Sequence, residues 1–330
     1  RTVLPFLKLD SDPYVVVHNG RLVYVLDGYT WSNLYPYAKR VTPVGGPARL
    51  FDRTNYVRNS VKAVVDAYDG SLTFYISDPT DPIIATYAKI FPGTLKPLTE
   101  MPASLRLHLR YPEDMFKVQS DMYRVYHMQD PQIFYNKEDA YSRPREIYLD
   151  KEQDMDPYYV IMRLPGHPSA EFMLILPFTP VNKNNANAWL AGRADGEHYG
   201  KLLAFKFPND KLVFGPSQIE SRIDQDDRIA DQFGKWKNSG STIIRGNLLF
   251  VPVGDSYLYV EPIYLQSQQS KLPELTRVVV AAGERIEMEA SLEDALNKVF
   301  RTTIFRPQGG IGAPVVTPAA SHQAVFGVTE

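Results

Sequence analysis

The residues of this sequence with the most evident chemical potential lie in one short stretch, Asp195-Gly196-Glu197-His198-Tyr199-Gly200. The stretch places two carboxylates and an imidazole between glycines, and loops on a rigid scaffold are where catalytic and binding groups concentrate. An imidazole beside carboxylates can transfer a proton near neutral pH. Asp195, Glu197 and His198 are therefore catalytic candidates. The alternative, which we favour, is a solvated turn before a strand that begins near Leu202.

The six histidines do not form a zinc motif in the sequence. They are His18, His108, His127, His167, His198 and His322. No two of them are spaced i, i+2 or i, i+4, and no HExxH is present, so the usual ligand spacings of zinc are missing. His127 ends a tyrosine-rich stretch of helical spacing, with Asp130 nearby. We favour a buried or helix-capping role for His127 over a role in a site.

Three groups of closely spaced carboxylates offer the oxygen ligands that calcium prefers. They are Asp10 with Asp12, Asp78 with Asp81, and Asp224 with Asp226 and Asp227. None is followed by the remaining ligands of an EF-hand loop, and Asp-Pro is ordinary turn chemistry. We therefore predict no cofactor, and keep a calcium ion at Asp224, Asp226 and Asp227 as the alternative.

A second candidate site is the aromatic stretch 29–37, which contains Tyr29, Trp31, Tyr35 and Tyr37. Tyrosine and tryptophan in an irregular segment give rigid contact area together with a polar group. Such a surface suits a glycan, a peptide or another protein, and these four residues are our ligand-binding candidates. The alternative, which we favour, is that the rings cover the core of the preceding hairpin.

Composition and missing motifs narrow the function further. The 330 residues carry 36 basic and 38 acidic side chains, evenly interspersed, so no nucleic-acid partner is expected. The absence of cysteine excludes disulfides, thiolate metal sites and a cysteine nucleophile. No GxSxG, Walker or dinucleotide-binding motif is present in the sequence. A carboxylate pair for glycoside hydrolysis is defined by the distance between the two groups in space, so the sequence cannot identify one. The apolar run 172–178 is too short to span a bilayer. The sequence begins with Arg1, and no signal-like segment follows, so we expect the chain to be a piece of a longer protein.

The secondary structure that positions these residues can be predicted most clearly for the stretch 55–82. Asp69-Gly70 lies between two β-rich runs, which predicts a hairpin with a two-residue type I′ turn. That turn would set Val65 opposite Phe74 on a buried apolar face. Lys62 and Asp66 would then point away from this core.

The remaining chain alternates hairpins with short helices. Further hairpins are predicted for 14–17 with 21–27, 158–164 with 171–177, 248–253 with 257–265, and 277–281 with 285–289. Helices are predicted at 82–91, 112–126, 184–192, 224–236 and 292–300, whereas 130–136 is predicted to be extended. Both faces of 158–164 and 171–177 are largely apolar, which is typical of central strands covered on two sides.

This succession predicts an α+β fold in which antiparallel hairpins alternate with short helices. The alternative is an irregular β-propeller-like, all-β core with inserted helices. We expect one domain over 1–300, with two subdomains meeting near residue 150 as a variant. The Pro/Gly/Ala-rich segment 301–330 is predicted to be a flexible tail.

Long strings of the sequence resemble one family, the uncharacterised protein family UPF0182. The strings are 58–70, 108–114, 158–166, 176–180 and 244–249, and the resemblance covers roughly residues 1–300. It implies large bacterial membrane proteins with several N-terminal transmembrane helices followed by a large region outside the cytoplasmic membrane. This chain resembles the later part of that region. The resemblance implies no reaction, so no functional residue is carried over.

Three functions are compatible with these observations. The first, which we favour, is an extracytoplasmic interaction or ligand-binding module of the cell envelope. Its expected partners are the transmembrane region of its own longer protein and an envelope protein, glycan or lipid. The second is an envelope hydrolase or transferase acting on glycan or lipid with carboxylates as acid and base. The third is a periplasmic gate of a transporter. An enzyme is less favoured than a binding module.

Overall fold

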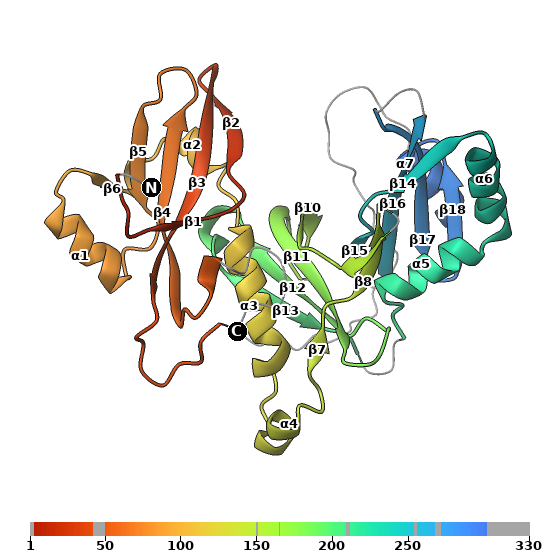
Figure 1. The fold of residues 1–330 in the computed structure, drawn as a ribbon, viewed down its shortest axis with the longest axis horizontal. Coiled ribbons are helices and arrows are strands. Elements are labelled where there is room, and N and C mark those ends of the chain that lie inside the picture. The colour runs from red at the N-terminus through yellow and green to blue at the C-terminus, as the bar shows by residue number, and fades with distance from the viewer. Residues whose placement is uncertain are drawn as a thin grey trace.

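A computed structural model describes residues 3–41, 50–149, 151–164, 166–208, 212–253, 256–267 and 272–301. Three sheets built largely from antiparallel strands follow one another along the longest axis in chain order, with short helices against them (Figure 1). The fold is therefore α+β, as predicted. Because the sheets stand in a row and not around a common axis, the propeller alternative is wrong. The predicted tail lies outside the described residues beyond Arg301.

The first sheet has the strand order β1-β3-β4-β5-β6, with β2 paired to β3. Its strands are β1 (Lys8–Leu9), β2 (Tyr14–His18), β3 (Arg21–Ser32), β4 (Tyr56–Asp66), β5 (Leu72–Ile76) and β6 (Leu95–Pro97). The β2–β3 hairpin is confirmed. His18 pairs with Arg21, and Asn19 and Gly20 both have positive φ, 50° and 73°, as a type I′ turn requires.

The β4–β5 hairpin forms, but in a register two residues away from the predicted one. Val65 pairs with Leu72, and Phe74 pairs with Ala63. The turn is longer than two residues: Gly70 N donates to the Asp66 carbonyl at 3.0 Å, and Gly70 has φ 70°. A shift by two keeps every side chain on its face, because strands have a period of two. The pattern therefore predicted correctly which residues share a face, whereas the turn length was wrong.

The prediction that Lys62 points to solvent is also wrong. Its side chain is fully buried and binds the equally buried Asp27. The face that carries Lys62 is covered by Met101, Leu105 and Leu109. Asp66, at the strand end, does leave the core and binds Arg21 at 2.7 Å.

Helix α1 (Pro82–Ile90) connects β5 to β6 within the first sheet, and three further helices and a 3₁₀ turn lead from β6 to the middle sheet. The latter are η2 (Leu98–Glu100), α2 (Ala103–Arg106), α3 (Glu113–Tyr126) and α4 (Pro131–Asn136). The predicted start of α1 is confirmed, because the Asp81 carboxylate accepts from the backbone N–H groups of Ile83 and Ile84. The segment expected to be extended is α4. Asp130 caps that helix, and Pro131 occupies its first turn.

The middle sheet has the order β10-β11-β12-β13, with β7 paired to β11. Its strands are β7 (Tyr141–Ser142), β10 (Tyr158–Arg163), β11 (Ala170–Pro180), β12 (Ala188–Arg193) and β13 (Leu202–Lys206); β8 (Arg145–Tyr148) and β9 (Lys151–Asp154) pair separately. The helix predicted at 184–192 is instead β12. All six of its residues are buried. A strand buried on both faces lacks the alternation of apolar and polar residues by which a strand is recognised, and this is why the segment was predicted to be a helix.

The third sheet has the order β14-β16-β17-β18, with β15 paired to β16. Its elements are β14 (Ser241–Arg245), β15 (Leu249–Val253), β16 (Ser256–Ser267), β17 (Glu274–Ala282), β18 (Arg285–Glu289) and the helices α5 (Pro216–Gln225), α6 (Asp227–Asn238) and α7 (Leu292–Phe300). The helix predicted at 224–236 is confirmed as α6 over 227–236, whereas residues 224 and 225 belong to the end of α5. Asp226 separates the two helices with an extended backbone and caps α6.

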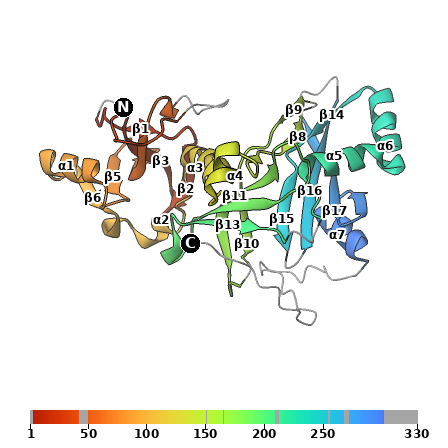
Figure 2. The same cartoon turned by 90° about the horizontal axis from the view of Figure 1, so that it is seen from below.

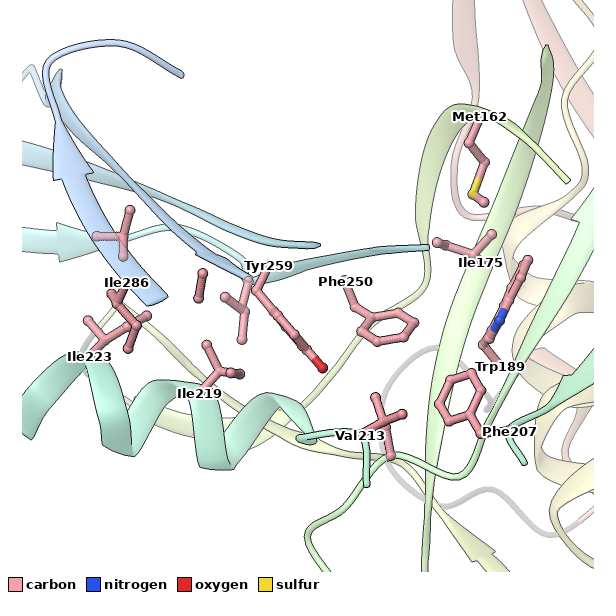
Figure 3. Close-up of a cluster of buried hydrophobic side chains, with 14 of the residues drawn as sticks. Met162, Ile175, Trp189, Phe207, Val213, Ile219, Ile223, Phe250, Tyr259 and Ile286 are labelled. Carbon is pink, nitrogen blue, oxygen red and sulfur yellow. The ribbon is translucent and has the colours of Figure 1, made fainter. Parts of the chain in front are cut away.

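The two later sheets share one core, drawn in Figure 3. Trp189 and Ile175 of the middle sheet pack into the same cluster as Phe250 and Tyr259 of the third. The opposite face of the middle sheet packs on α3 through Phe116. Helix α3 therefore lies between the first and middle sheets, as both views show (Figures 1 and 2).

Candidate functional site

A groove of about 1200 Å³ opens between α3, the start of β4 and the middle sheet. Pockets for small molecules usually measure about 300–1000 Å³, so this groove is large enough for a ligand of considerable size. It exists because α3 contacts the middle sheet through Phe116 while neighbouring side chains of the helix leave space beside it. The groove is the candidate functional site.

One wall of the groove is apolar and adaptable. Five α3 side chains and three from the middle sheet form it: Met115, Val118, Met122, Tyr123, Tyr126, Leu190, Leu202 and Ala204. The methionines can adjust to different shapes, because their side chains are unbranched and flexible. This wall suits an acyl chain or another extended apolar body.

His127 supplies a polar group at the end of α3. Its Nδ1 lies 2.8 Å from the Tyr123 carbonyl, and its ring stacks on Tyr141 at 3.8 Å. Nε2 is buried without a hydrogen-bond partner among the described residues. Burial lowers the pKa of His127, the charge of Lys206 lowers it further, and the Tyr123 carbonyl together with the backbone and charge of Asp139 offsets this only in part. Because a carbonyl only accepts, Nδ1 carries the proton of the neutral ring, and Nε2 is left as an acceptor.

Charged side chains of both signs complete the lining. Lys39, Lys206, Asp130 and Asp139 all contribute to it. Asp130 is already engaged, because its carboxylate accepts from the backbone N–H groups of Gln132 and Ile133. The groove thus combines an apolar wall with hydrogen-bonding and charged groups, and can bind a molecule with an apolar body and a polar head.

The four aromatic candidates separate into two environments. Tyr29 is fully buried, and its hydroxyl donates to Asp10, so its ring packs in the core and has no surface for a ligand. Trp31, Tyr35 and Tyr37 are exposed. Tyr35 stacks on Tyr56 with ring centroids 5.7 Å apart, and Tyr56 lines the groove. A ligand-binding role of the three exposed rings stays a prediction.

The catalytic candidates lie outside the groove. The Asp195 carboxylate accepts the backbone N–H of Phe172 at 2.7 Å, Glu197 is exposed, and His198 ends a short 3₁₀ turn, η3 (Gly196–His198). The structure brings His198 beside His167, which the sequence had not suggested. A catalytic role for these residues stays a prediction.

The calcium candidates do not converge on a common point. Asp224 binds Arg245 at 2.7 Å, whereas Asp226 caps α6 and pairs with Arg228. Asp227 follows in the first turn of that helix. The carboxylates of Asp78 and Asp81 are likewise engaged, by Arg58 and by the α1 cap. Helix capping and ion pairs are therefore sufficient to explain why these acidic residues lie close together in the sequence.

The structure contains a buried charge cluster that sequence reasoning missed. Arg245 lies in the core: its Nε and Nη2 donate to Glu261, Nη2 also donates to Glu220, and Nη1 donates to Asp224. Glu220 and Glu261 are both buried. Burial raises the pKa of Glu220 to about 8, and the charge of Glu261 adds to the shift. Arg245 ends β14, Glu261 comes from β16, and Glu220 and Asp224 lie one turn apart on α5, so no local motif could have revealed the whole cluster.

This cluster predicts a specific pH dependence of stability. The folded-state pKa of Glu220 lies near 8, against 4.5 ordinarily, so over this range the folded chain binds a proton that the unfolded chain lacks. Its stabilisation is complete below pH 4.5 and is lost as the pH rises through 8, by up to about 1.4 kcal/mol per pH unit. Denaturant unfolding of the wild type and of Glu220→Gln at several pH values measures this slope. A variant slope as steep as that of the wild type would contradict the assignment.

Comparison with known proteins identifies close relatives. The family model described as "Uncharacterised protein family (UPF0182)" matches residues 1–236. A UPF0182 protein of Desulforamulus reducens is 53% identical over 98% of this chain and 34% of its own length. Those of Moorella thermoacetica and Trichodesmium erythraeum are 50% and 46% identical over 99% and 93% of this chain, each over 34% of its own length. The chain thus spans about a third of these relatives.

Two further findings complete the comparison. No solved structure matches the chain. Among the described residues, no helix is both long and apolar enough to cross a membrane.

Proposed function

This chain belongs to the uncharacterised protein family UPF0182, and from that premise we propose that it is the ligand-binding module of a longer cell-envelope protein, on the extracytoplasmic side of the membrane. The resemblance described above supports this location, and the relatives, which are about three times as long, support the view that the chain is part of a longer protein. The observation that carries the binding function is the groove beside α3. Its partners would be the remainder of its own protein and an envelope molecule bound in the groove.

The lining indicates an amphiphile with one apolar chain and a head that donates hydrogen bonds. The methionine- and tyrosine-rich wall accepts the chain, because burying apolar surface yields about 25 cal/mol per Å². His127 Nε2, an acceptor without a partner among the described residues, would receive a hydroxyl or amide N–H of the head. A monoacylglycerol has both features and is a suitable probe.

A bulky side chain at Met122 is expected to weaken binding of such a probe by tenfold or more. Met122→Trp places an indole in the groove, where it competes with the acyl chain for space. The measurement is fluorescence titration with a monoacylglycerol carrying a fluorophore at the end of its acyl chain. Val17→Trp is the matched control, because Val17 is exposed on β2 of the first sheet and does not line the groove.

A second variant tests the head group. His127→Phe retains an aromatic ring that can stack on Tyr141 but removes Nε2, so the monoacylglycerol should bind more weakly while the corresponding hydrocarbon-tailed methyl ester, whose head donates no hydrogen bond, should not. Failure of the wild-type chain to bind the probe would overturn the proposal. So would equal binding by Met122→Trp and the wild type, provided that the variant is folded.

The two other predicted functions, an envelope hydrolase or transferase and a transporter gate, stay predictions. A hydrolase would be favoured by converging carboxylates of raised pKa in a cleft. Glu220 and Glu261 do converge and have raised pKa values, but both are buried around Arg245 and neither lines the groove. The observations therefore support binding best.

A further inference from the structure

Three metal-ligating side chains meet at the far end of the middle sheet, away from the residues that line the groove. His167 comes from the turn between β10 and β11, Glu171 from the start of β11, and His198 from the end of η3. Each offers one ligand atom, and the three atoms all lie within 4.8 Å of one another. His167 Nδ1 is 3.8 Å from Glu171 Oε1, and the two imidazole rings meet edge to face at 6.1 Å.

We propose that His167, Glu171 and His198 bind a divalent transition metal of the zinc class. Two imidazole nitrogens and one carboxylate oxygen are a donor set that such metals prefer, whereas calcium and magnesium require mainly oxygen. Ligand atoms about 2.1 Å from a tetrahedral ion lie about 3.4 Å from one another. The observed separations, at most 4.8 Å, therefore need a contraction of no more than about 1.4 Å, which rotation of side chains on a turn and a short 3₁₀ segment can supply.

An independent observation at His198 supports the site. Its Nδ1 is buried and has no hydrogen-bond partner among the described residues. Leaving a buried polar atom unsatisfied costs about 1–3 kcal/mol. A metal bound through Nδ1 would satisfy this atom with the lone pair that the neutral ring presents.

Arg193 orients the carboxylate ligand. Its Nε donates to Glu171 Oε2 at 2.7 Å, and its Nη2 donates to Oε1 and lies 3.5 Å from His167 Nδ1. A carboxylate has about four lone-pair positions, so Oε2 can keep Arg193 while Oε1 turns to the metal. Outer contacts of this kind fix the orientation of metal ligands. The guanidinium charge also opposes the metal charge, which predicts weaker binding than by the same ligands without Arg193.

The three protein ligands would leave a tetrahedral ion with one open position. Structural zinc sites are closed by four protein ligands, whereas sites that bind a water or a ligand atom have three. In this proposal the loop of Asp195, Glu197 and His198 contributes one metal ligand, His198. The other two ligands, His167 and Glu171, could not be recognised from their spacing in the sequence.

Metal titration of the chain after dialysis against a chelator tests the proposal. Zn²⁺ is added in competition with a chromophoric chelator, and Co²⁺ is added separately for its visible spectrum. We expect one equivalent of each to bind, with the intense absorption of four-coordinate cobalt. His198→Ala and His167→Ala should each weaken Zn²⁺ binding by about tenfold or more. His108→Ala, at an exposed histidine on the first-sheet side, should bind as the wild type does.

The histidine variants carry the test because they keep the buried Glu171–Arg193 pair intact and so preserve the fold. Glu171→Gln would leave Arg193 buried without its counter-charge. Absence of stoichiometric Zn²⁺ and Co²⁺ binding by the wild type would overturn the proposal. Unchanged affinity in folded His198→Ala would do so as well. Neither outcome affects the groove, whose probe binding is measured separately.

Discussion

Replacing Arg245 with methionine is expected to lower the free energy of unfolding by about 3–5 kcal/mol, enough to unfold many domains. Arg245 is buried, and its guanidinium donates hydrogen bonds to Glu220 and Glu261, which are 2% and 0% exposed. Methionine fills much of the space but leaves both acidic groups in the core without this donor and without its positive charge. Each of them must then stay or become protonated without that hydrogen bond, or draw water into the core, and both outcomes cost free energy.

Urea denaturation of Arg245→Met, followed by circular dichroism, measures this loss. Arg145→Met is the matched control: Arg145 pairs with Glu152 and Asp154 on the surface, where such pairs contribute about 0–1 kcal/mol. Should the single variant fail to fold, the triple variant with Glu220→Gln and Glu261→Gln keeps the test open, because it removes the buried negative charge and should recover folding. A folded Arg245→Met chain as stable as the control would refute the structural role of the cluster.

Local chemistry explains which elements could be predicted from the sequence. Asn19-Gly20 can take positive φ, so the β2–β3 turn follows from residue type. Asp81-Pro82 combines a side-chain cap with a fixed φ, and the helix begins there. In both cases neighbouring residues determine the conformation, and no distant contact is needed.

Distant contacts explain the errors. The six residues of β12 have no polar alternation, because α3 covers one face of the strand and the third sheet shares a core with the other. A short apolar run of this kind fits a buried strand as well as a helix. Asp69-Gly70 gave the correct turn but the wrong length, because Asp66 accepts from the backbone N–H groups of Tyr68 and Asp69 within a longer turn.

The candidate sites show the same limit more strongly. His198 was recognisable from the carboxylates near it, but His167 and Glu171 approach it only through the β10–β11 hairpin. The α3 stripe has helical spacing, yet its residues divide between core and groove: Phe116 is buried, and Met122 lines the cavity. Periodicity tells which side of a helix is apolar, and only packing tells whether that side is filled.

The second large effect is expected at Lys62, which the sequence pattern placed on the surface but which is buried. Lys62→Met is expected to reduce the free energy of unfolding by about 3–5 kcal/mol, because Asp27 stays buried with Asn59 as its remaining side-chain donor. If the pattern-based expectation of a solvent-facing lysine were correct, the change would be within about 0.5 kcal/mol. Lys96→Met, at an exposed lysine on β6 of the same sheet, is the matched control.

The loss should depend on pH in a defined direction. Burial already raises the pKa of Asp27 above 3.8, and Lys62 opposes the shift, so removing Lys62 raises that pKa further. Above pH 3.8 the folded variant then retains a proton that its unfolded chain releases, and its stability falls as the pH rises. The deficit of Lys62→Met relative to the wild type should therefore be larger at pH 8 than at pH 5. Adding Asp27→Asn removes the buried charge, keeps an acceptor for Asn59, and should restore most of the loss at both pH values. A double variant no more stable than Lys62→Met would show that the lysine acts through packing instead of charge.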